Sequence, residues 1–192
     1  MTTKPHIAIV IGSTRPGRYA DKAAAWMLKQ TRARDDIEAE LLDLRDYALP
    51  FFDEKGPLAL IASENAEALR WQQTLARFEG FIFVVAEYNH SVTGVLKNAL
   101  DQAYKEWGRK PFTAIGYGGI GAARAVEQLR LIAIALGMVS TANSVHISGA
   151  DFKSTAANKP IEDIEAGLLG VTKAALDELV WWAHATMAAR AG

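Results

Sequence analysis

The first predicted strand and its turn are Ile7-Ala8-Ile9-Val10-Ile11, followed directly by Gly12-Ser13-Thr14-Arg15-Pro16-Gly17-Arg18. A continuous apolar run of this kind is typical of a parallel strand that helices cover on both faces. The glycine-rich turn leads into a helical pattern over residues 18–34. This stretch therefore predicts the first strand–turn–helix unit of an α/β fold.

The same unit recurs along the chain. Strand-like runs at residues 6–12, 37–43, 80–86, 112–117 and 143–148 alternate with helical patterns at 18–34, 61–78, 94–106, 121–137 and 162–188. The first, third and fourth runs are almost continuously apolar, whereas the second and fifth alternate apolar with polar residues, as edge strands do. We therefore expect a flavodoxin-like three-layer sandwich with a five-stranded parallel sheet of order 2-1-3-4-5, and not the extended order 3-2-1-4-5-6.

Composition narrows the class of protein. The chain has 192 residues, half of them apolar, which predicts a single domain spanning residues 1–192. Its 21 basic and 22 acidic residues are spread along the chain, so no basic surface for nucleic acid is expected. The start shows no signal peptide and no apolar run reaches membrane-spanning length, which predicts a cytoplasmic protein without membrane insertion.

Several kinds of catalytic or metal site are excluded or disfavoured by residue type. The chain contains no cysteine, which removes disulfides, thiolate catalysis and most structural zinc sites. The histidines are too scattered to predict a metal centre: His6, His90, His146 and His184. We therefore expect no metal.

The turn at residues 12–18 predicts a phosphate site. Backbone N–H groups of a glycine-rich turn and of the following helix start converge on one space, and the guanidinium groups of Arg15 and Arg18 can add charge-assisted bonds. A Walker A loop is excluded because Arg18 and Tyr19 follow Gly17, and a dinucleotide loop because residue 14 is Thr. A phosphatase loop would need a cysteine nucleophile. The remaining interpretation is a loop that binds phosphate without attacking it.

Two more segments lie where strands of the predicted sheet end, at the edge where α/β proteins bind ligands. The first, Ala86-Glu87-Tyr88-Asn89-His90-Ser91, offers an aromatic ring, an amide and exposed N–H groups that suit a flat heteroaromatic ligand. The alternative is a polar loop in which Ser91 or Thr93 caps a helix that begins near Gly94.

The second segment, Gly116 to Gly121, contains a G-x-G-x-x-G pattern. A dinucleotide site is disfavoured here because no acidic residue occurs in 131–142 and the motif follows the fourth strand. The glycines predict either close approach of the backbone to a ring or a helix start packed tightly on the sheet. The long connection from Arg45 to Leu60 either shapes a site or is a proline-stiffened loop with buried Phe rings.

Together these segments resemble the NADPH-dependent FMN reductases, a flavodoxin-like family that includes quinone, azo-dye and chromate reductases. The resemblance rests on residues 12–18, on Glu87-Tyr88-Asn89-His90-Ser91 with residues 94–101, and on Gly116-Tyr117-Gly118-Gly119 with residues 123–130. It implies that the FMN phosphate is bound by Ser13, Arg15, Arg18, Tyr19 and Ala20. It also implies that the flavin ring is bordered by Glu87, Tyr88, Asn89, His90 and Gly118.

The resemblance further implies an activity. NADPH or NADH would reduce bound FMN, and a small acceptor (quinone, azo compound, chromate or free flavin) would then be reduced by a ping-pong mechanism, with no side chain acting as catalytic acid. It also implies a homodimer or homotetramer. Three positions depart from the family pattern: Ala86 and Thr93 stand where proline is common, and Gln102 where tryptophan is common. The alternative function is an electron carrier that binds FMN without oxidising a nicotinamide, which the near-neutral charge disfavours.

Overall fold

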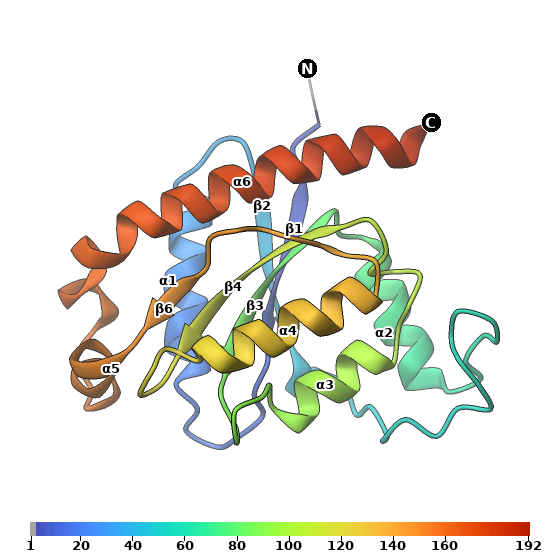
Figure 1. Cartoon of the computed structure of the whole chain (residues 1–192), viewed down its shortest axis with the longest axis horizontal. Helices are drawn as coiled ribbons and strands as arrows, with labels where there is room; N and C mark the ends of the chain where they lie inside the picture. Colours follow the sequence, from blue (N-terminus) through green and yellow to red (C-terminus); the bar gives the residue numbers. More distant parts are fainter. Residues whose placement is uncertain (1–2) are drawn as a thin grey trace.

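The computed structural model describes residues 3–192, which form one parallel sheet covered by helices on both faces (Figure 1). The strands are β1 (His6–Ile11), β2 (Glu38–Asp43), β3 (Gly80–Ala86), β4 (Pro111–Tyr117), β5 (Val139–Ser140) and β6 (Val145–Ile147). Their order is β2-β1-β3-β4-β5, and β6 also pairs with β4. The predicted order 2-1-3-4-5 is therefore confirmed, with the alternating strands at the edges.

The sheet edge beside β4 differs from the prediction, because two short strands, β5 and β6, lie there in place of one. β5 pairs with Pro111 and Phe112 at the start of β4, and β6 pairs with residues 115–117 at its end. Between them, the hydroxyls of Thr113 and Thr141 both donate to the carbonyl of Asn143 at 2.9 and 2.8 Å. Side chains thus satisfy the backbone where the regular ladder is interrupted.

The helices form two outer layers. They are α1 (Ala20–Arg32), α2 (Ala66–Ala76), α3 (Gly94–Asp101), α4 (Ala123–Ala135), α5 (Gly149–Ala156) and α6 (Glu165–Ala191). One apolar cluster joins the sheet to α2, α3 and α4, and a second joins its other face to α1 and α6. Figure 1 shows α6 on one side of the sheet and α3 and α4 on the other. The predicted three layers are therefore confirmed.

The first strand, β1, contributes side chains to both layers. Ala8 and Val10 of β1 pack in the α2–α4 cluster, whereas Ile7, Ile9 and Ile11 pack in the α1–α6 cluster. All five side chains are buried, as the continuous apolar run predicts.

Three helices depart clearly from the predictions, and one of them, α3, ends at Asp101 and not at residue 106. α2 begins at Ala66 and not at residue 61, because the Asn65 side chain caps it by accepting from the N–H groups of Glu67 and Ala68. α5 was not predicted, since its eight residues bury only Thr155 and carry no apolar stripe. Among residues 3–192, no helix combines the length and apolarity that crossing a lipid bilayer requires. The loops that follow β1, β3 and β4 meet at one edge of the sheet, where the site lies.

Candidate functional site

The loop after β1 is held close to the sheet at its first residue. The N–H of Gly12 donates to the carbonyl of Val84 at 3.1 Å, and a Cβ at Gly12 would lie 2.7 Å from that oxygen. The loop then turns through Arg15 to Arg18, with Gly17 at φ +64°, before α1 begins at Ala20. Glycine is needed at both positions, first for close approach and then for backbone conformation.

This loop presents unpaired donors. Among residues 3–192, no hydrogen-bond partner occurs for the backbone N–H groups of Ser13, Thr14, Arg15, Gly17, Tyr19 and Ala20. Tyr19 occupies the N-cap position of α1, but its side chain forms no capping hydrogen bond. Unpaired N–H groups at a helix start attract anions. The predicted phosphate site requires unpaired N–H groups of this kind, and the binding of phosphate here stays a prediction.

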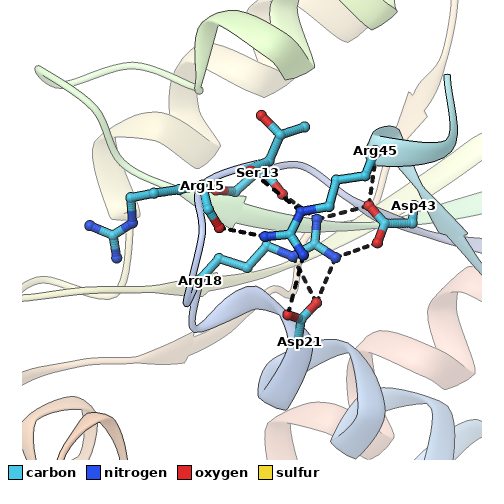
Figure 2. A network of polar contacts seen from close by, with 7 residues as sticks. Ser13, Arg15, Arg18, Asp21, Asp43 and Arg45 are labelled. Carbon is cyan, nitrogen blue, oxygen red and sulfur yellow. Dashed lines mark hydrogen bonds and ion pairs between the residues drawn. The ribbon is translucent and has the colours of Figure 1, made fainter. Parts of the chain in front are cut away.

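The two arginines of the loop have different surroundings. Arg15 is exposed, and it forms no ion pair with any residue in 3–192. Arg18 is buried, and its guanidinium bonds to Asp43 at 2.8 Å, to Asp21 at 2.7 Å and to the Ser13 carbonyl. Figure 2 shows Arg18 inside this cluster, while the guanidinium of Arg15 points away from it. Only Arg15 presents its guanidinium to solvent.

The charges in this cluster stabilise one another. The hydrogen bond to Asp43 raises the pKa of Arg18 above its ordinary value, although burial opposes the shift. Burial alone would raise the pKa of Asp43, but the bonds from Arg18 and from the N–H of Arg45 outweigh it and hold that pKa below its ordinary value. Both groups therefore stay charged at neutral pH.

The other residues predicted for the phosphate are placed as follows. The Tyr19 hydroxyl lies 2.7 Å from Thr155 Oγ1 on α5, and burial raises the pKa of that phenol. Ala20 is fully buried against the sheet. Tyr19 and Ala20 thus offer their N–H groups and not their side chains, whereas Ser13 lines the cavity described next.

A cavity of about 490 Å³ opens beside the loop. It is lined by Ser13, Thr14, Arg15, Leu49, Phe51, Tyr88, Thr93, Gly94, Val95 and Asn98. Tyr88 brings the predicted second segment to the same space as the phosphate loop. Leu49 and Phe51 belong to the long connection after β2, so that connection shapes the cavity, and the Phe51 ring is exposed and not buried. Sequence reasoning did not single out Asn98 or Val95, whose signal was their place in the motif at residues 94–101.

The loop after β3 turns back on itself through strained residues. The N–H groups of Tyr88 and Ser91 each donate to the other's carbonyl, at 2.9 and 3.1 Å. Between them, Asn89 and His90 have φ values of +52° and +69°. Residues other than glycine adopt this conformation at a cost, which strained binding loops often carry.

Glu87 joins this loop to the next one. Its carboxylate accepts from the N–H groups of Arg124 and Ala125 at the start of α4, at 3.2 and 3.3 Å, and pairs with the Arg124 guanidinium. Burial alone would raise the pKa of Glu87, but the bonds from Arg124 and from the N–H of Ala125 together outweigh it and hold the pKa below its ordinary value. The carboxylate therefore caps α4, a role that the sequence analysis did not predict.

The glycine-rich loop after β4 contains glycines of both predicted types, those with open space beside the backbone and those packed tightly at a helix start. A Cβ at Gly118 or Gly119 would meet nothing within 4 Å, so the backbone is open there. A Cβ at Gly116 would lie 2.2 Å from the Gly121 carbonyl, and one at Gly121 would lie 2.8 Å from His146 Cβ. The first pair permits approach of a ligand, and the second pair packs the helix start.

Thr93 has the capping role that the sequence offered as an alternative. Its hydroxyl accepts from the N–H of Leu96 at 3.2 Å and donates its own hydrogen to the Gly12 carbonyl. The cap on α3 is confirmed for Thr93, and the same side chain ties α3 to the phosphate loop.

Comparison with known proteins agrees with this geometry. The family described as NADPH-dependent FMN reductase matches residues 5–151. An NAD(P)H-dependent FMN reductase of Nectria sp is 36% identical over 129 residues, 64% of each chain, and a 2-hydroxy-1,4-benzoquinone reductase of Burkholderia sp is 35% identical over 69% of this chain and 72% of that protein. The aligned part spans less than two thirds of the Nectria protein's length.

Solved structures show the same fold. The flavoenzyme NAD(P)H:(acceptor) oxidoreductase FerB of Paracoccus denitrificans superposes with a TM-score of 0.69 at 25% identity, covering 95% of this chain and 98% of FerB. A flavodoxin of Pseudomonas aeruginosa superposes with a TM-score of 0.53 at 22% identity, covering 88% and 98%, which concerns the fold alone. The family match, the sequence relatives and the loop geometry have one conclusion in common: the chain belongs to the NADPH-dependent FMN reductase family, whose cofactor is FMN and whose co-substrate is NAD(P)H.

Proposed function

We propose that this protein is an FMN-dependent oxidoreductase that transfers hydride from NADPH or NADH through bound FMN to a small acceptor such as a quinone, an azo compound, chromate or free flavin. The observation that carries the proposal is that Ser13, Thr14 and Arg15 line the cavity and that their N–H groups have no hydrogen-bond partner among residues 3–192. Family membership supplies the identity of the cofactor.

The loop residues would hold the phosphate. The N–H groups of Ser13, Thr14 and Arg15 supply neutral donors, and the Arg15 guanidinium supplies a charge-assisted one. On the ring side, Tyr88 lies at the cavity and the open backbone at Gly118 and Gly119 leaves room for a flat group. We propose that Glu87, Asn89 and His90 border the flavin through the fixed turn they form and not through free side chains.

When bound, FMN supplies the redox chemistry, taking a hydride from the nicotinamide and returning two electrons to the acceptor. The protein's residues bind, orient and partly cover the reactants. Leu49, Phe51 and Val95 give the cavity an apolar wall that suits planar aromatic substrates. Glu87 is tied to Arg124, so we assign no catalytic acid.

Steady-state kinetics test this proposal. Under anaerobic conditions, FMN-loaded protein should oxidise NADPH or NADH over many turnovers only when an acceptor such as a benzoquinone is present. Because nicotinamide and acceptor would occupy one space in turn, double-reciprocal plots at several acceptor concentrations should be parallel. Intersecting lines would contradict the ping-pong order, and absence of turnover with every acceptor would contradict the reductase. A cytoplasmic location, a single domain and assembly as a homodimer or homotetramer stay predictions.

A further inference from the structure

The first four carbonyl groups of the phosphate loop, from Gly12 to Arg15, accept hydrogen bonds from side chains. The Gly12 carbonyl accepts from Thr93 Oγ1, and the Ser13 carbonyl accepts from Arg18 Nη1. Arg45 donates to the next two, from Nε to the Thr14 carbonyl at 3.3 Å and from Nη2 to the Arg15 carbonyl at 2.6 Å. Three side chains thus donate to four consecutive carbonyls.

This pattern fixes the direction of the amides. In a planar trans peptide the C=O of one residue and the N–H of the next point in opposite directions. Holding the carbonyls of Gly12, Ser13 and Thr14 therefore turns the N–H groups of residues 13, 14 and 15 to the opposite side. These are three of the N–H groups that lack a partner among residues 3–192.

Asp43 at the end of β2 anchors both arginines. Its Oδ1 accepts from Arg18 Nη1 at 2.8 Å and from the backbone N–H of Arg45 at 2.9 Å. The Arg18 side chain is only 2% exposed, and Asp21 on α1 bonds to its Nε at 2.7 Å. Figure 2 shows the two guanidinium groups gathered between Asp21 and Asp43.

We infer that Arg18, Arg45 and Asp43 are positioning residues, which hold the loop's carbonyls so that its amides converge on the cofactor phosphate. In this account Arg18 is a part of the scaffold and not a phosphate ligand. The inference rests on the proposed function, since it concerns the same phosphate site.

The substitution Asp43→Asn distinguishes a positioning role from a direct electrostatic effect, because the two predict opposite changes in FMN affinity. Asp43→Asn removes a negative charge near an anion site, so electrostatics alone predicts tighter FMN binding. If Asp43 acts by positioning Arg18 and Arg45, its loss predicts weaker FMN binding, because those arginines no longer hold the loop's carbonyls. Asp46→Asn is the matched control, since Asp46 is exposed, lies three residues along the chain and has no side-chain bond to the loop.

The measurement is the affinity of each variant for FMN and for riboflavin, which lacks the phosphate. We expect Asp43→Asn to weaken FMN binding about tenfold, as loss of a charge-assisted bond does, with riboflavin binding unchanged. Asp46→Asn should leave both affinities unchanged. Unchanged riboflavin binding also shows that the variant is folded.

Other outcomes have definite meanings. Equal or tighter FMN binding by Asp43→Asn would overturn the inference while the proposed function stands. Wild-type protein that binds FMN no better than riboflavin would instead overturn the phosphate site itself. If Asp43→Asn does not fold, Arg45→Met keeps the inference testable, because that side chain is 38% exposed. Unchanged FMN affinity in Arg45→Met would then overturn it.

Discussion

Replacing Arg15 with Ala should weaken the binding of FMN and leave the stability of the fold almost unchanged. Arg15 is exposed and has no ion pair within residues 3–192, so its loss should change the free energy of unfolding by less than about 0.5 kcal/mol. Hydrogen bonds to charged groups contribute about 1.5–3 kcal/mol, and an exposed arginine belongs at the lower end. We therefore expect FMN to bind about tenfold more weakly.

The assay compares FMN with riboflavin, followed by quenching of flavin fluorescence. Arg32→Ala is the matched control, because it removes the same charge from an exposed residue at the far end of α1. That helix is about 20 Å long, beyond the screening length of about 8–10 Å in ordinary buffers. Unchanged FMN affinity in Arg15→Ala, or an equal loss for riboflavin, would refute the assignment of Arg15 to the phosphate.

Three further predictions concern stability. Burial lowers the pKa of Lys110 from 10.5 to about 8, so between these pH values the unfolded chain holds a proton that the folded chain has lost. The free energy of unfolding, measured by urea denaturation, should therefore rise between about pH 8 and 10.5. An undiminished rise in Lys110→Met would contradict this assignment. His90→Gly should stabilise the fold by about 0.5–1 kcal/mol because φ is +69° there, and a lower melting temperature would refute the strain. Glu87→Gln should destabilise by about 1–2 kcal/mol through the weaker cap on α4, and no change in urea midpoint would exclude that role.

The strand order was predictable because burial on two faces leaves a different pattern from burial on one. β1, β3 and β4 are buried along almost their whole length, whereas β2 has exposed positions. The division of the last edge into β5 and β6 was not predictable, because it depends on threonine hydroxyls from two segments that meet at the Asn143 carbonyl. The unpredicted α5 carries no amphipathic pattern, so periodicity could not reveal it.

The position of the site was predictable from the topology, but the role of each side chain was not. The sequence does not distinguish the roles of Arg15 and Arg18, since both belong to the same glycine-rich turn. Their difference comes from Asp43, which lies 25 residues after Arg18 and reaches it only through the pairing of β1 with β2. Glu87 likewise meets Arg124 across 37 residues. Local spacing indicates which residues surround a site, and tertiary partners decide which of them are free to bind.

The most direct test of the account is the visible spectrum of the protein reconstituted with FMN, followed anaerobically as NADPH or NADH is added. We expect a bound-flavin band that bleaches on addition of the nicotinamide and returns when a quinone is supplied. Binding without bleaching would contradict the reductase and favour an electron carrier. Failure to bind FMN at all would contradict the assignment of the loop from Gly12 to Arg18 as a phosphate site.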